Sequence, residues 1–473
     1  MTTEEVSNRV IRGKNKIGYS LGTFGMFLLR ILISTFIFQF YVYTINLNSV
    51  FVSIGISLYL IISAVFSIFW GVIIDRKTPG RLGRRRPFLL IGLPIWIISN
   101  ILIWTPPFYC PPENSFFLPT TFYFWTIMIF IALSDTLIYT AYLAMFPEQF
   151  RSKKSQESIA TMQGIFLIIA SIIALLLPLI VQNLVDPENV KWWQPSGRVF
   201  LFWMPIIGIS SVILGVLTVF LVYFSVDESF YNQYHFQKKE NLSIKRTFTQ
   251  ILVPLKDKKY LKYLSVRFFN STSSNILGIA IIPFLTFVLE FRESEFFIYV
   301  LLSTITKFTW YFLWKYFFQT KELKQRYSIC IASGFISSFL ILLFLFNIES
   351  FFLKIVLFII VVGTILGSLY AYPLFAVPMS AILVYNAAFT IDEFNPEEEV
   401  SKISGAYYGS LNFMISLGKA LGSILMGIAF IGSNQENPLI IVLSLAAMGI
   451  FYLISFISLR TIEIRRNVVP ELN

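Results

Sequence analysis

Twelve long apolar stretches limit the fold of this chain more than any other feature of its sequence. A helix that crosses a bilayer needs about 20 predominantly apolar residues. Only helices and closed barrels satisfy every backbone N–H and C=O group inside lipid. The stretches show no alternation of period two, so they predict an all-α membrane protein. They cover residues 18–43, 50–74, 87–105, 121–146, 157–181, 197–224, 261–289, 296–319, 327–346, 351–385, 403–431 and 437–459.

The composition agrees with a chain that lies in lipid. Hydrophobic residues make up 56% of the sequence and charged residues 13%, whereas soluble proteins have about 25% charged residues. The net charge of +11 can indicate a nucleic-acid partner. Such a protein displays its basic residues on one soluble surface, and the apolar stretches leave little room for one. We therefore exclude nucleic acid as a partner.

The placement of Lys and Arg predicts the orientation. With a cytoplasmic N-terminus, 30 of the 37 basic residues fall in cytoplasmic segments and 4 in external ones. Cytoplasmic loops carry an excess of Lys and Arg, so we expect a multi-pass protein of the cell membrane with both termini cytoplasmic. The first apolar stretch lacks a small-residue cleavage site and is interpreted as the first span.

The longest polar interruption divides the spans six and six. It predicts an N-terminal six-helix bundle over residues 1–224, a central cytoplasmic loop over 225–260 and a C-terminal six-helix bundle over 261–473. Two six-helix halves are typical of the major facilitator fold, with a solute site near the middle of the membrane. The tenth stretch is too long for one simple span and contains Pro373 and Pro378, which predict a kinked helix.

The loop after the second span carries a dense motif of Gly, Asp and Arg. We expect Gly71 to let neighbouring helices approach closely, and Asp75 to hold an arginine across the bundle interface. Such a contact would break and re-form as the halves rock. The alternative is a basic anchor with no gating role. The gating loop comprises Gly71, Asp75, Arg76, Gly83, Arg84, Arg85 and Arg86.

The same loop carries a family resemblance. With Gly405-Ala-Tyr-Tyr-Gly409 at the eleventh span, it resembles the glycoside–pentoside–hexuronide:cation symporters of the major facilitator superfamily. The resemblance implies a transporter that couples a sugar-like solute to a cation and needs no cofactor. Two acidic positions of the family on the second span are Ser63 and Ser67 here. Sodium needs several hard oxygen ligands, so a proton is the more plausible coupled ion.

Two opposite charges lie at similar depth in the first half. An ionisable residue at the bilayer centre costs about 2.5–3.5 kcal/mol on insertion scales and indicates function. Arg30 and Asp135 each lie about 18 Å from the cytoplasmic ends of their spans, at 1.5 Å per residue. We expect them to pair, with Asp135 as the coupling residue and Tyr139 and Tyr142 on the same helix face. The alternative is a static tie between helices.

The second half supplies two polar stripes at helical spacing. An ammonium beside indole rings suits a sugar stacked on Trp or an anionic group held by Lys. The alternatives are interfacial packing for the tryptophans and a lysine that extends toward the membrane surface. The stripes consist of Lys307, Trp310 and Trp314 on the eighth span, and of Asn412, Ser416 and Lys419 on the eleventh.

These observations predict a monomeric transporter that works by alternating access. The expected solute is a sugar, glycoside or sugar acid, carried by secondary active or facilitated transport. A lipid or lysolipid carrier and a non-transporting receptor on the same scaffold are the alternatives. The spans contain no acidic pair, His cluster or nucleophile motif, so we do not expect an enzyme. One His and two separated Cys predict no metal site.

Overall fold

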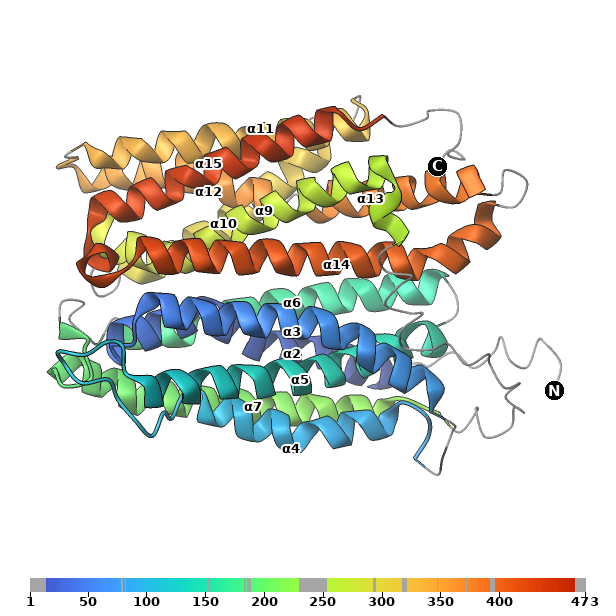
Figure 1. The fold of residues 1–473 in the computed structure, drawn as a ribbon, viewed down its shortest axis with the longest axis horizontal. Helices are drawn as coiled ribbons and strands as arrows, with labels where there is room; N and C mark the ends of the chain where they lie inside the picture. Colours follow the sequence, from blue (N-terminus) through green and yellow to red (C-terminus); the bar gives the residue numbers. More distant parts are fainter. Residues whose placement is uncertain are drawn as a thin grey trace. The chain divides into compact units, whose positions relative to one another are not determined.

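The computed structural model describes helices throughout and no strand within residues 14–77, 80, 82–150, 153–182, 184, 189–228, 253–291, 295–316, 321–346, 348–370, 372–391 and 396–463. The chain divides into two compact units, Met1–Ile244 and Lys245–Asn473. Figure 1 shows the long, nearly parallel helices of each. The division falls inside the polar segment expected to link two bundles.

The described residues of unit 1 form six long helices. Three of them begin with proline in the first turn, where its missing N–H has no intrahelical partner to lose. α3 begins at a side-chain cap, because Asn48 Oδ1 accepts the Val50 N–H at 2.9 Å. The helices are α2 (Lys14–Gln39), α3 (Ser49–Arg76), α4 (Arg86–Leu102), α5 (Leu118–Gln149), α6 (Lys153–Gln182) and α7 (Pro195–Ser225).

The helices of unit 1 share one apolar core. α2 packs against α6 and α7, α3 packs against α5, and α4 packs against α5 and α7. Trp96 of α4 is 1% exposed and lies in this core with Tyr19, Met26 and Tyr142. This packing brings α2, α4 and α5 together at the depth where the sequence places Arg30 and Asp135.

Unit 2 contains seven long helices and several short helical turns. α9 packs against α14 and α15, α10 against α12, and α11 against α12 and α15. The long helices are α9 (Lys258–Pro283), α10 (Glu295–Tyr316), α11 (Leu323–Leu340), α12 (Phe351–Tyr370), α13 (Tyr372–Ile391), α14 (Pro396–Ala429) and α15 (Pro438–Arg460). The short turns are η4 (Val253–Lys256), η5 (Phe284–Val288), η6 (Ile341–Leu345) and η7 (Gly432–Glu436).

The helices confirm the expected spans. Eleven helical segments of the described chain are long and apolar enough to cross a membrane, and α4 adds a shorter apolar one. The tenth stretch contains α12 and α13, which lie on either side of Ala371. The predicted kink would fall beside Ala371, a residue outside the described part of the chain.

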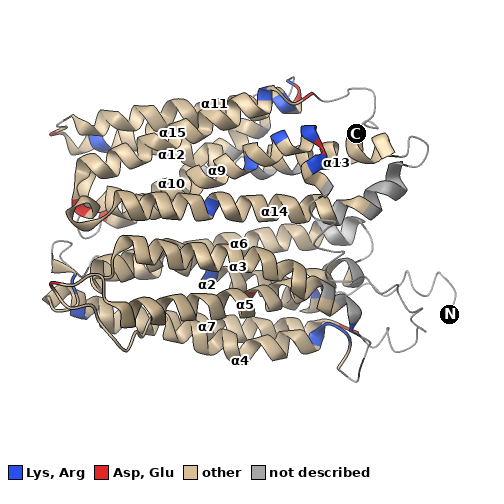
Figure 2. Cartoon of the chain, viewed as in Figure 1, with Lys and Arg blue, Asp and Glu red and all other residues tan. Residues whose placement is uncertain are grey.

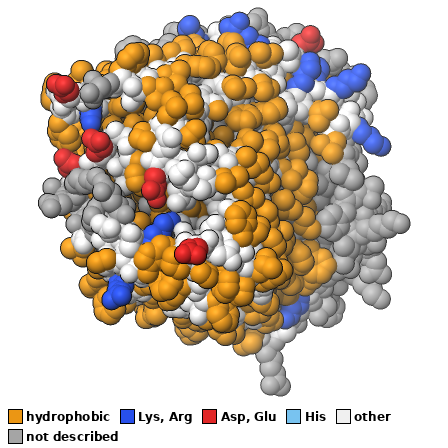
Figure 3. Space-filling view, turned by 60° about the vertical axis from the view of Figure 1, so that its left-hand side comes forward, with side chains coloured by type: hydrophobic (Ala, Val, Ile, Leu, Met, Phe, Trp, Pro, Cys, Tyr) orange, Lys and Arg blue, Asp and Glu red, His pale blue; other side chains and the backbone are white. Residues whose placement is uncertain are grey.

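The helix surfaces are suited to lipid. Figure 2 shows Lys, Arg, Asp and Glu mainly near helix ends, with long uncharged middles. Hydrophobic side chains cover most of the face in Figure 3. Large apolar residues such as Phe202, Leu301 and Ile360 are more than half exposed. A soluble protein rarely exposes so much contiguous apolar surface.

The long helices α2 and α9 end in the same way. A π-helical turn of 5 residues continues each one. The turn that follows α2 is η1 (Phe40–Thr44). Two residues after each turn comes a left-handed residue, Asn46 with φ 66° and Glu290 with φ 58°. The two units therefore repeat a backbone arrangement that their side chains do not.

In unit 2, α14 approaches α9 closely at two glycines. A Cβ atom at Gly418 would meet the carbonyl oxygen of Phe268, and one at Gly422 would lie 2.8 Å from the carbonyl oxygen of Thr272. The Thr272 hydroxyl donates to the Gly418 carbonyl at 3.0 Å. Small residues that let helix backbones approach are a common basis of helix packing in membranes.

We predict that Gly418→Ala destabilises unit 2 by about 1–3 kcal/mol, as overpacking typically does, because a backbone carbonyl cannot rotate away like a side chain. Thermal unfolding of the purified protein in detergent should show a lower midpoint. Gly278→Ala is the matched control, since nothing lies within 4 Å of a Cβ there. Equal midpoints for the two variants would contradict the predicted close packing.

Candidate functional site

Arg30 of α2 and Asp135 of α5 form an ion pair inside unit 1. Arg30 Nε donates to Asp135 Oδ2 at 2.7 Å. Asp135 is 4% exposed, whereas the side chain of Arg30 is 22% exposed. Both residues lie on the expected helices and in the expected contact. A charge-assisted hydrogen bond of this length is among the stronger polar contacts in proteins.

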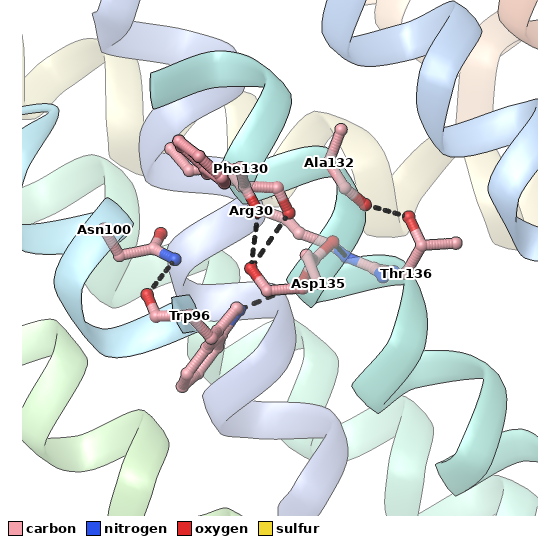
Figure 4. Close-up of polar contacts among 9 residues, drawn as sticks. Arg30, Trp96, Asn100, Phe130, Ala132, Asp135 and Thr136 are labelled. Carbon is pink, nitrogen blue, oxygen red and sulfur yellow. Dashed lines mark hydrogen bonds and ion pairs between the residues drawn. The ribbon is translucent and has the colours of Figure 1, made fainter. Parts of the chain in front are cut away.

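Trp96 of α4 holds the other oxygen of this carboxylate. Its Nε1 donates to Asp135 Oδ1 at 3.3 Å. Asn100, one turn further along α4, donates from its side-chain Nδ2 to the Trp96 carbonyl. Figure 4 shows Arg30, Trp96 and Asp135 close together, with Asn100 beside Trp96. We did not predict Trp96 as a site residue. The available signal was a tryptophan within an apolar span, because a buried indole N–H usually has an acceptor.

Aromatic rings enclose the guanidinium of Arg30. Its central carbon lies 3.9 Å from the centroid of the Tyr139 ring and 5.5 Å from that of Phe27. Tyr59 of α3 lies close enough to interact electrostatically with both Arg30 and Asp135. The guanidinium is thus oriented by a carboxylate on one side and an aromatic face on the other, which is a favourable cation–π arrangement.

Tyr142, the other tyrosine predicted on this helix face, links three helices. Its hydroxyl lies 3.0 Å from the Thr23 hydroxyl, accepts from Gln163 Nε2 at 2.6 Å, and donates to the Tyr19 carbonyl at 3.0 Å. The rings of Tyr19 and Tyr142 stack at 4.6 Å. Tyr142 is 1% exposed, so in this conformation its hydroxyl is not presented to a solute.

The predicted residues of α10 lie at a helix interface of unit 2. Trp310 and Trp314 stack with their ring centroids 5.6 Å apart. Trp314 is 2% exposed and meets the ring of Phe375 edge-on. A Cβ atom at Gly367 of α12 would collide with Trp310. The side chain of Lys307, on the same helix, lies outside the described residues.

The polar stripe of α14 is partly exposed and has a neighbour that we did not predict. Asn412 is exposed, and Ser416 and Lys419 are partly exposed. Further along the helix, the Ser423 hydroxyl accepts from Asn275 Nδ2 of α9 at 2.7 Å. The sequence did not predict a role for Asn275, because its partner Ser423 lies on α14, far from α9 in the chain.

The gating loop surrounds a buried acid of another segment. Gly71 of α3 has open space beside it, and the side chains of Asp75 and Arg76 lie outside the described residues. Arg84 and Arg85 are 8% and 7% exposed. The guanidinium of Arg86 donates to the Tyr223 carbonyl at 2.6 and 2.9 Å. The basic run thus lies against the end of α7.

Glu228, just after α7, is the acid that this loop encloses. It is 1% exposed and accepts the Arg85 N–H at 3.1 Å and the Arg86 N–H at 3.4 Å, at the start of α4. A carboxylate at a helix N-terminus satisfies N–H groups that lack intrahelical partners. Gly83 has φ +88°, and a Cβ atom there would collide with this carboxylate. We had placed Glu228 in the polar loop and missed it.

The family model described as MFS/sugar transport protein matches residues 18–427. The chain belongs to this family. Among curated proteins, an uncharacterized symporter, YnaJ of Bacillus subtilis (strain 168), is 27% identical over 267 residues, which are 55% of this chain and 53% of that protein. The match therefore spans about half the length of that relative.

Solved structures of low sequence identity share the fold of this MFS/sugar transport protein. The nucleoside transporter NupG has a TM-score of 0.65 at 13% identity and covers 95% of this chain and 100% of its own. The xylose transporter XylE from E. coli has a TM-score of 0.62 at 12% identity and covers 96% of each chain. The expected major facilitator fold is thereby confirmed.

Among the described residues, no three His, Cys, Asp or Glu side chains are grouped so that they could hold a metal ion. The arrangement around Arg30 can donate hydrogen bonds, stack on a ring and compensate a negative charge. These are properties of a binding site.

We predict that Glu228 makes the stability of unit 1 depend on pH. Burial raises the pKa of Glu228 above its usual value of 4.5, and the bonds from Arg85 and Arg86 oppose this shift in part. The folded protein therefore binds this proton more tightly than the unfolded chain, so the free energy of unfolding falls as the pH rises above about 4.5. Glu228→Gln should remove this loss.

Thermal unfolding in detergent between about pH 4.5 and 7.5 tests this prediction, since a raised pKa of Glu228 acts within that range. Relative to the wild type, Glu228→Gln should gain stability as the pH rises. The exposed neighbour provides the control, because Asp227→Asn should keep the wild-type dependence. Parallel profiles for wild type and Glu228→Gln would show that this carboxyl is not the responsible group.

Proposed function

We propose that the chain is a secondary transporter of a small polar solute and works by alternating access. The solute we propose is a sugar, glycoside or sugar acid. The description of the family as MFS/sugar transport protein supports this substrate class. The name of YnaJ, an uncharacterized symporter, supports coupled transport.

The observation that carries the proposal is the partly exposed side chain of Arg30, a charged group among apolar helices. One of its N–H groups is bound to Asp135, and the side chain is 22% exposed. Arginine has five N–H donors in a fixed plane, so four are available in principle for hydroxyl or carboxylate oxygens of a solute. A charged group between apolar helices is costly, and solute binding is a reason for its presence.

Asp135 and Trp96 act, on this proposal, as positioning residues. Both carboxylate oxygens of Asp135 accept hydrogen bonds from protein donors, and the residue is 4% exposed. A solute therefore reaches Asp135 only through Arg30. Trp96 fixes the carboxylate, the carboxylate fixes the guanidinium, and Tyr139 presents a ring on which a sugar could stack.

The pair also provides a route to proton coupling. A solute that draws the guanidinium away would leave an uncompensated buried carboxylate, which is strongly unfavourable. Protonation of Asp135 would remove that charge, so solute and proton would bind together. We propose a proton as the coupled ion in preference to sodium, because sodium needs several hard oxygen ligands.

We further propose that the protein lies in the cell membrane as a monomer, with both termini in the cytoplasm. The support for this orientation is the excess of Lys and Arg in the segments that it makes cytoplasmic. The gating role of Asp75 and Arg76 and the solute contacts of Lys307, Asn412, Ser416 and Lys419 remain proposals of the same kind.

We predict that Arg30→Gln lowers solute uptake at least about tenfold, as expected for loss of one charge-assisted contact. Uptake of radiolabelled sugars, glycosides and sugar acids into proteoliposomes is the measurement. Arg30→Lys should retain part of the activity, because it keeps the charge but not the planar donors. Arg198→Gln, at an exposed arginine of α7, is the control and should transport normally.

Wild-type uptake by Arg30→Gln would contradict a solute contact at this residue. Tight binding of a solute without flux would instead identify a receptor. Selective movement of lysolipids rather than sugars would favour a lipid carrier. Each result therefore separates the proposed substrate class from one of its alternatives.

We predict that Asp135→Asn separates transport from coupling. An imposed inward proton gradient should stimulate uptake by the wild type and leave uptake by Asp135→Asn unchanged. Exchange of internal for external solute needs no net proton movement and should persist in the variant. Stimulation of both proteins to the same extent, or stimulation by sodium alone, would be incompatible with a coupling proton at Asp135.

A further inference from the structure

Unit 2 contains a pocket that lies apart from the residues discussed so far. It opens between the beginning of α11 and the end of α15 and has a volume of about 650 Å³. Both helices end here in basic residues, and both carry apolar side chains toward the middle of the membrane. Nothing in the proposed transport mechanism uses this pocket.

The walls of the pocket are positively charged. Its lining includes Lys321, Lys324 and Arg460 but only one acid, Glu322. The Arg460 guanidinium lies 4.6 Å above the ring of Phe456, another lining residue. The lining therefore has a formal charge of +2, which favours an anionic ligand. Arginine and lysine together are typical of sites for phosphate groups.

Backbone contacts hold this charge in place. Lys324 Nζ donates to the carbonyl of Arg460 at 2.9 Å and to that of Ile462 at 2.5 Å, and so joins α11 to the last turn of α15. The pocket also includes the first turn of α11, which has 18 residues and no side-chain cap at Glu322. N–H groups at a helix N-terminus add to the attraction for an anion.

The part of the pocket farthest from the helix ends is apolar, and an apolar surface continues from it along α11 and α15. Ile329 and Ala332 of α11 line it together with Phe456. One turn further along α11, Ile336 is 56% exposed, and one turn before Phe456, Leu453 is 39% exposed. The basic pocket is thus followed by an apolar surface along the two helices. A ligand with a phosphate at one end and hydrocarbon chains at the other would match both surfaces.

We propose that this pocket binds the headgroup phosphate of an anionic phospholipid, with Arg460 and Lys321 on the phosphate and the acyl chains along α11 and α15. In the proposed orientation it faces the cytoplasmic leaflet. Basic pockets between membrane helices on that side are known to suit anionic headgroups. A free phosphate ion would use the same cations without the apolar continuation.

Native mass spectrometry of the purified full-length protein tests the proposal, with dioleoyl phosphatidylglycerol and dioleoyl phosphatidylcholine added in equal amounts. The wild type should retain one phosphatidylglycerol more tightly than any phosphatidylcholine. In the double variant Lys321→Gln/Arg460→Gln, the affinity for that lipid should fall about tenfold or more, since each cation near a membrane surface contributes to anionic lipid binding.

The matched control is Lys256→Gln/Lys258→Gln, which removes two exposed cations at the same end of unit 2 that do not line the pocket. Its lipid affinity should stay within about twofold of the wild type. The charge-conserving variant Lys321→Arg/Arg460→Lys should also retain binding, which separates loss of charge from loss of folding.

Three results would overturn the proposal. The first is equal retention of the two lipids by the wild type. The second is an equal loss in the control and pocket variants, because the attraction would then be diffuse. The third is displacement of phosphatidylglycerol by an equal concentration of inorganic phosphate, which would identify a site for the free ion.

Discussion

A buried ion pair in an apolar environment is the interaction on which the organisation of unit 1 depends. Either charge would be costly without the other, because an isolated charge between membrane helices lacks the solvation that water gives. The pair is completed by Trp96 on a third helix and by the ring of Tyr139. α2, α4 and α5 must therefore meet at one depth, and their packing around the core of Trp96 brings them there.

Unit 1 contains a second buried acid, and the two are stabilised differently. Asp135 accepts from side chains, which can rotate away, whereas Glu228 accepts from backbone N–H groups of Arg85 and Arg86, which move only with α4. The first arrangement can change with the occupancy of a site. The second links the end of α7 to the start of α4 and keeps those helices in register. The proposed binding site and an anchor between two helices are thus made from the same chemical group, a carboxylate.

The sequence was sufficient to predict the helices and one pair of their contacts. Apolar length predicts spans because lipid tolerates few backbone structures, and depth along two helices predicted that Arg30 meets Asp135. The roles of Trp96, Glu228 and Asn275 were not predictable in this way. Each depends on a partner that is distant in the chain, and helix periodicity does not specify which faces meet.

The matched ends of α2 and α9 show which features the two units have in common and which they do not. The residue of α9 in the same register as Arg30 is Ser274, so the backbone recurs without the charge. The two units share a π-helical turn and the left-handed residue that follows it. Side chains at matching positions can therefore differ, so Arg30 and Ser274 occupy equivalent places with different chemistry.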